Sequence, residues 1–143
     1  MRERLRSAAR LAWSVPSRTI GHRGTALLFF CLLDFVYGAS MVLAPAETLA
    51  TPAYVFLARL LPVPTWGAIW LGVGAVCLVQ AFMRSDRLAF ACASALKVGW
   101  GLVHLIGWIA VDLPRGYVAA AIWLAFAGFV QVISQWPEPG GER

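Results

Sequence analysis

Two opposite charges lie inside apolar stretches of this 143-residue chain, where a charge is costly and therefore informative. Asp34 lies in LDFVYG (33–38), and Lys97 lies 63 positions later in LKVGWG (96–101). The two segments match at a leucine, an aromatic residue and a glycine, whereas their charges are opposite. An insertion scale assigns each charge a cost of about 2.5–3.5 kcal/mol at the bilayer centre, and pairing offsets much of it. We therefore expect Asp34 and Lys97 to pair, within one chain or between chains.

His104 shares a helical face with Lys97, because the two positions are seven residues apart. One interpretation is a proton relay with Asp34 and Lys97, since imidazole titrates near neutral pH. The other is a neutral, hydrogen-bonded histidine near the membrane interface. The sequence favours the second without excluding the first.

The elements that must position these residues are membrane helices. The chain is 60% hydrophobic and only 13% charged, against about 25% charged for a soluble domain. Crossing a bilayer as a helix takes about 20 mostly apolar residues. The sequence predicts an all-α integral membrane protein with four transmembrane helices, at 25–43, 66–83, 88–110 and 117–135.

The first span and the first loop need separate arguments. Ala44-Pro45-Ala46 resembles a signal-peptide cleavage site, but span 25–43 is longer than a signal h-region and contains Asp34, so an uncleaved span is favoured. In the loop, Thr51-Pro52 begins a helix pattern that is too short to span. We expect a short interfacial helix there, lying on the outer leaflet.

Basic residues predict the orientation of the chain in its membrane. Placing the N-terminus in the cytoplasm puts nine Lys or Arg residues inside and two outside, so both termini are expected there. The cytoplasmic parts are an N-terminal arm (1–24) and a tail (136–143) around the membrane domain (25–135). The arm is expected to contact anionic lipid headgroups rather than nucleic acid through Arg2, Arg4, Arg6, Arg10, Arg18 and Arg23. The expected interface anchors are Trp66, Trp108, Tyr117 and Trp136.

The second and fourth spans also match one another. Both contain AIWL, at 68–71 and 121–124, followed by small residues. The chain is therefore interpreted as two tandem parallel hairpins. Small residues permit close helix packing, and those expected to do so are Ala91, Ala95, Gly99, Gly72, Gly74, Ala125 and Gly128.

Motifs for other chemistry are absent from the sequence. It has no phosphate-binding glycine loop, no HExxH or paired-cysteine metal site and no nucleophile elbow. The three cysteines have no ligand spacing and are expected to pack as small hydrophobic residues. We expect no enzymatic activity, no metal and no cofactor.

Several segments together resemble small, mostly uncharacterised four-span membrane proteins of actinobacteria and their tailed bacteriophages. They are the basic arm, LDFVYG, AIWLGVGAVCLVQAF, ASALKVGWG, AIWLAFAGFV and QWPEP, which cover about residues 24–139. Some such proteins resemble holins, which open lesions in the inner membrane. Holins often end in a basic tail, whereas this chain ends in WPEPGGER.

Three functions follow as hypotheses. The first is a holin-like protein that forms homo-oligomers through the small face of the third span. The second is a structural or partner-binding membrane subunit, in which the Asp34–Lys97 pair fixes the folding of the chain or its assembly with another membrane protein. The third is a small transporter or DoxX-like protein that uses the buried charges as a proton or substrate path. Pairing between chains favours the first, and a wet, charged cavity within one chain favours the third.

Overall fold

The computed structural model describes residues 20–137, which form helices and no strand. Four helices are long and apolar enough to cross a membrane, and the predicted all-α fold with four spans is confirmed. With 18 to 25 residues each and a rise of 1.5 Å per residue, they match a hydrocarbon core roughly 30 Å thick. They are α2 (His22–Val42), α5 (Val63–Gln80), α6 (Arg87–Val111) and α7 (Gly116–Ser134).

The helix ends lie within three residues of the expected positions. Helix α5 begins three residues earlier than expected, at Val63, so that Pro62-Val63-Pro64 forms its start. Pro62 is also the N-cap of α5, and Pro64 lies in its first turn, where a missing backbone N–H costs nothing. The segment therefore ends one helix and begins the next.

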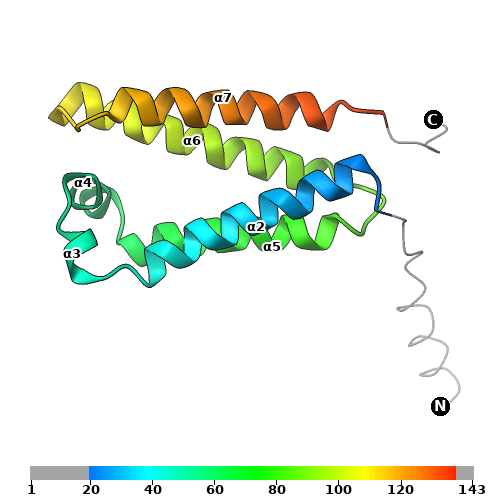
Figure 1. Ribbon diagram of the computed structural model, residues 1–143, viewed down its shortest axis with the longest axis horizontal. Helices are drawn as coiled ribbons and strands as arrows, with labels where there is room; N and C mark the ends of the chain where they lie inside the picture. Colours follow the sequence, from blue (N-terminus) through cyan, green and yellow to red (C-terminus); the bar gives the residue numbers. More distant parts are fainter. Residues whose placement is uncertain (1–19, 138–143) are drawn as a thin grey trace, which may run out of the picture.

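The helices form two antiparallel hairpins. Helix α2 packs chiefly on α5, and α6 packs chiefly on α7, while α5 also contacts α6 (Figure 1). Helix α2 begins and α7 ends at the same end of the bundle, here called the terminal end. The opposite end, where the first hairpin carries its long connection, is called the loop end (Figure 1).

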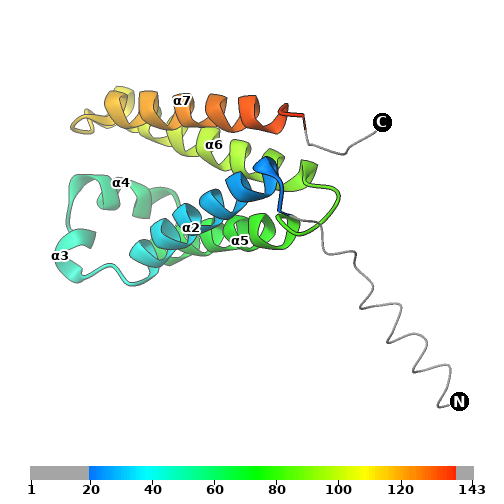
Figure 2. The same cartoon turned by 45° about the vertical axis from the view of Figure 1, so that its right-hand side comes forward.

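The long connection contains two short helices, α3 (Ala46–Leu49) and α4 (Pro52–Leu60). Figures 1 and 2 both show α4 between the two hairpins at the loop end. Phe56 and Leu57 of α4 are buried, and Phe56 lies against Gly107 of α6. The expected short helix is present, but it packs against both hairpins on its buried side instead of contacting only the lipid surface.

The turn between α6 and α7 reverses the chain within a few residues. Asp112 ends α6 in the left-handed region, with φ 49°, and the backbone N–H of Leu113 reaches back to the carbonyl of Gly107 at 3.2 Å. This hydrogen-bonded ending satisfies a carbonyl that the helix leaves open. The turn therefore makes α7 run antiparallel to α6, with the side chains of the two helices packed together.

Buried apolar residues form two clusters along the bundle. The cluster nearer the terminal end includes Leu27, Phe30 and Phe90, and the cluster nearer the loop end includes Trp70 and Trp100. Large apolar side chains on the outer faces are exposed, for example Phe29 at 56% and Ile109 at 69%. Such surfaces are expected of helices in contact with lipid, because a soluble protein rarely leaves so much apolar area uncovered.

Candidate functional site

The two intramembrane charges meet between the two apolar clusters. The ammonium group of Lys97 on α6 donates a hydrogen bond to Oδ1 of Asp34 on α2, and both side chains are 0% exposed. The expected contact is therefore present, and it lies within one chain. Removing either partner would leave the other charge buried without compensation.

Aromatic rings enclose the lysine. Its Nζ lies 5.0 Å from the ring centroid of Trp70 and 6.0 Å from that of Phe30. A cation over an aromatic face is attracted by the negative potential of the ring, most strongly when water is excluded. Trp70 was not singled out from the sequence, although it belongs to the repeated AIWL motif and so carried a usable signal.

Two polar atoms at this site have no hydrogen-bond partner among the described residues. They are Oδ2 of Asp34 and the indole nitrogen of Trp70, and both are buried. An unsatisfied buried donor or acceptor costs about 1–3 kcal/mol. The pair is thus closed off from solvent but not fully saturated with hydrogen bonds.

A layer of aromatic rings covers the loop-end side of the pair. Within it, the indole N–H of Trp100 on α6 donates to the phenol oxygen of Tyr37 on α2 at 3.2 Å. Neighbouring rings lie at centroid distances of 4.5 to 5.8 Å, mostly edge to face, an arrangement that favours aromatic pairs. The members of this aromatic layer are Tyr37, Trp66, Trp70, Trp100 and Trp123.

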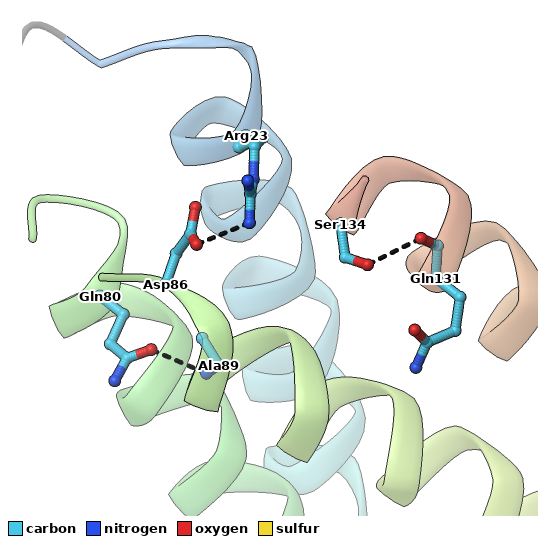
Figure 3. A network of polar contacts seen from close by, with 6 residues as sticks. All are labelled: Arg23, Gln80, Asp86, Ala89, Gln131 and Ser134. Atoms are coloured by element: carbon cyan, nitrogen blue, oxygen red, sulfur yellow. Dashed lines mark hydrogen bonds and ion pairs between the residues drawn. The ribbon is translucent and has the colours of Figure 1, made fainter. Parts of the chain in front are cut away.

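A second ion pair joins the same two helices at the terminal end. The guanidinium of Arg23 lies 2.7 Å from Oδ1 of Asp86, the N-cap residue of α6 (Figure 3). It also lies 5.2 Å from the centroid of the Phe90 ring. Arg23 was grouped with the lipid-surface arm, but it lies in the first turn of α2 and contacts protein. The remaining arm residues, Arg2, Arg4, Arg6, Arg10 and Arg18, lie outside the described residues.

The three contacts share one sequence separation. Arg23–Asp86, Asp34–Lys97 and Tyr37–Trp100 each join residues 63 positions apart. On α5 and α7, Trp70 meets Trp123, its counterpart in the AIWL motif, at 5.2 Å. Equivalent positions that face each other are what a two-fold axis produces. The hairpins are therefore arranged about an approximate two-fold axis that passes beside the ion pair.

The approximate two-fold axis also relates the packing within one hairpin to the packing within the other. A Cβ added at Gly38 would meet Gly67 and Leu71 of α5, at 2.8 Å from the Gly67 oxygen. At the equivalent Gly101, a Cβ would meet Leu124 and Ala120 of α7, at 2.9 Å from Leu124 Cγ. These glycines allow close helix approach and were matched in the sequence, but they were not named as packing residues.

His104 is not joined to the pair. Its Nδ1 lies 2.9 Å from the carbonyl oxygen of Trp100, one turn earlier in the same helix, and its ring packs on Trp100 at 5.2 Å. This is the local, hydrogen-bonded arrangement that the sequence favoured over a proton relay.

Most of the small residues expected to pack helices face outward instead. Gly74 packs as expected, because a Cβ there would lie 3.0 Å from the Phe35 ring. At Gly72, Gly99 and Gly128 a Cβ would meet nothing within 4 Å. Ala91, Ala95 and Ala125 are likewise exposed. Within one chain these six positions contact no neighbouring helix closely, so their faces are open to lipid or to another protein.

Among the expected interface anchors, three side chains are exposed and one points inward. Trp108 and Tyr117 are exposed at the loop end, with ring centroids 5.5 Å apart, and Trp136 is 43% exposed at the terminal end. Trp66 instead points into the protein, where its indole N–H donates to the carbonyl of Leu57 at 3.2 Å. It connects α4 to the aromatic layer.

Comparison with protein-family models, with curated proteins and with solved structures finds no match for this chain. Within residues 20–137, no group of three or more His, Cys, Asp or Glu side chains is placed to bind a metal ion. The arrangement at hand is a closed polar contact between two hairpins of a small helical membrane protein. Chemically, it can hold the hairpins in one register.

Proposed function

We propose that the chain is a structural, partner-binding membrane subunit whose two hairpins are held together by the Asp34–Lys97 pair. The observation that carries this proposal is that both charges are fully buried and pair with each other within one chain. Arg23–Asp86 and Tyr37–Trp100 join the same two helices on either side of the pair. Polar contacts at three depths along α2 and α6 hold the two hairpins in a fixed arrangement, as expected of a subunit that assembles with a partner.

The outward faces support the second part of the proposal. Ala91, Ala95 and Gly99 form an exposed small-residue strip on α6, without bulky side chains to hold a neighbouring helix away. Membrane helices associate through such strips because their backbones can approach closely. A helix of a partner protein in the same membrane is the occupant that this surface suits.

The same strip favours a second candidate, a holin-like protein that assembles from copies of itself. That function places the charges along a polar interior shared by several chains, whereas here they are already paired within each chain. A proton or substrate path would need a cavity at the pair. Three surface grooves among residues 20–137 are lined by neither Asp34 nor Lys97.

The deciding experiment is inducible expression in a bacterium, with membrane potential and culture density followed over time. Wild type is compared with Asp34→Asn, Lys97→Met and the exchange of both charges, Asp34→Lys with Lys97→Asp. Arg59→Gln, an exposed charge at the loop end, is the matched control. A structural subunit accumulates without harm, the single variants accumulate poorly, and the exchange restores the level. A sudden, timed depolarisation that the single variants alter would overturn the proposal in favour of a holin-like protein.

The location proposed for this unit is a bacterial cytoplasmic membrane with both chain termini in the cytoplasm. Its support is the nine-to-two distribution of Lys and Arg residues. Arg84, in the α5–α6 turn, and Arg87, the first residue of α6, belong to the more basic side, and Arg59 and Arg115 belong to the other.

A further inference from the structure

A groove opens between α5 and α6 at the terminal end. It has a volume of about 330 Å³, and its wall is almost entirely apolar. The residues that line it are Ala75, Val76, Val79, Gln80, Met83 and Leu88. Because α5 and α6 are membrane helices, this groove faces the hydrocarbon chains of the surrounding lipids.

The approximate two-fold axis produces a second groove, between α2 and α7, with a volume of about 340 Å³. Phe129, Ile133 and Trp136 of this groove are the counterparts of Val76, Gln80 and Met83, each 53 positions later. Thr25 is the counterpart of Leu88, 63 positions earlier. The molecule therefore contains two grooves of equivalent position and different chemistry.

The mouths of the two grooves differ in charge. Arg84 follows Met83 directly and Arg87 precedes Leu88, so each arginine is next in the chain to a residue that lines the α5–α6 groove. Both side chains are exposed, and neither forms an ion pair within the described residues. At the corresponding end of the α2–α7 groove, the arginine next to the lining residue His22 is Arg23, and its guanidinium is already paired with the carboxylate of Asp86.

Gln80 makes the α5–α6 mouth more polar still. Its side-chain oxygen accepts the backbone N–H of Ala89 at 2.8 Å, which leaves its amide NH₂ as a donor (Figure 3). The same hydrogen bond ties α5 to the first turn of α6 and keeps the two walls of the groove in place.

We propose that the α5–α6 groove binds an anionic phospholipid, with one acyl chain against Ala75, Val79 and Leu88 and the phosphate on Arg84 and Arg87. Arginine suits a phosphate because its planar guanidinium donates two parallel hydrogen bonds to phosphate oxygens. A zwitterionic lipid has acyl chains that fit the same apolar wall, but its headgroup also carries a cationic group, which Arg84 and Arg87 repel. The groove therefore selects by headgroup charge, independently of what the protein assembles with.

The test is native mass spectrometry of the full chain in detergent, titrated with phosphatidylglycerol or with phosphatidylcholine of the same acyl chains. Wild type is expected to retain one phosphatidylglycerol in preference to phosphatidylcholine. The double variant Arg84→Gln, Arg87→Gln is expected to bind it roughly thirtyfold more weakly, because each arginine beside an anionic lipid contributes about 1 kcal/mol and about 1.4 kcal/mol corresponds to a factor of ten. Arg59→Gln with Arg115→Gln removes two exposed arginines at the loop end and is the charge-matched control.

A second pair of variants tests the apolar wall. Ala75→Leu places a larger side chain in the groove and is expected to weaken phosphatidylglycerol binding, whereas Ala125→Leu, on the exposed face of α7, is expected to leave it unchanged. Glycerol phosphate, the soluble headgroup, should not bind at the same concentration. Equal retention of both lipids by wild type, or equal loss in the two arginine variants, would overturn the proposal. So would tight binding of glycerol phosphate.

Discussion

Trp100 donates its indole N–H to the phenol oxygen of Tyr37 at 3.2 Å, and the two residues occupy equivalent positions in the two hairpins. The contact lies one helical turn from the Asp34–Lys97 pair and closes it on the loop-end side. Equivalent positions have thus acquired complementary chemistry three times along α2 and α6: acid and base twice, donor and acceptor once. Such differences are what a symmetric dimer of identical hairpins could not have.

The first prediction concerns this hydrogen bond. Tyr37→Phe keeps the ring packing but leaves the Trp100 indole N–H without its acceptor, so it should lower the free energy of unfolding by about 1 kcal/mol. Trp100→Phe combined with Tyr37→Phe should cost less than the sum of the single changes, because they share one interaction. Unfolding in mixed micelles, followed by circular dichroism, measures these differences. Strict additivity would show that the bond contributes nothing.

The second prediction concerns the ion pair. Asp34→Asn or Lys97→Met alone should destabilise the protein by about 3–5 kcal/mol, because each leaves a buried charge unpaired. The double variant Asp34→Leu, Lys97→Met removes both charges and should be far closer to wild type. The same unfolding measurement gives the values. A double variant as unstable as the worse single one would mean that the pair itself, rather than the uncompensated charge, carries the stability.

The third prediction compares glycines. Gly38→Ala should destabilise the first hairpin by about 1–3 kcal/mol, because the new Cβ would lie 2.8 Å from the rigid Gly67 carbonyl. Gly101→Ala should cost less, since its nearest obstacle is the flexible Leu124 side chain. Gly72→Ala, where the space is open, is the matched control and should be neutral or slightly stabilising. Thermal unfolding ranks the three, and a reversed order would contradict the packing described.

The fourth prediction concerns the terminal end. Asp86→Asn removes a carboxylate that is 2.7 Å from the Arg23 guanidinium and should cost about 1 kcal/mol, a value reduced because Arg23 is partly exposed. The loss should shrink at high salt, which screens partly exposed charges. Asp112→Asn, an exposed position that also tolerates asparagine in the left-handed region, should change little. Stability measured at two salt concentrations separates these outcomes.

The fifth prediction concerns orientation. Single cysteines introduced at Ser85, in the α5–α6 turn, and at Asp112, in the α6–α7 turn, should react from opposite sides of the membrane. In a background with the three native cysteines replaced, an impermeant maleimide added to intact cells should label only position 112. Labelling of position 85 alone would reverse the proposed topology.

The amino-acid sequence by itself determined the membrane helices and the partnership of the two charges. Runs of about 20 apolar residues have one stable form in lipid, since every backbone polar group must be satisfied within the helix. An isolated charge in such a run requires a counter-charge, so Asp34 and Lys97 were an expected pair. The 63-residue match placed them at one depth.

Tertiary structure alone decided which side chains surround the pair and which small residues pack. Gly72 and Gly74 differ by two positions on one helix, so they face different directions, and only Gly74 meets α2. Trp66 has the sequence signature of an interface anchor yet points inward, because α4 supplies a carbonyl for its indole. These outcomes depend on how the two hairpins are rotated relative to each other. The shapes of side chains from all four membrane helices set that rotation, and the residue pattern of a single helix does not contain this information.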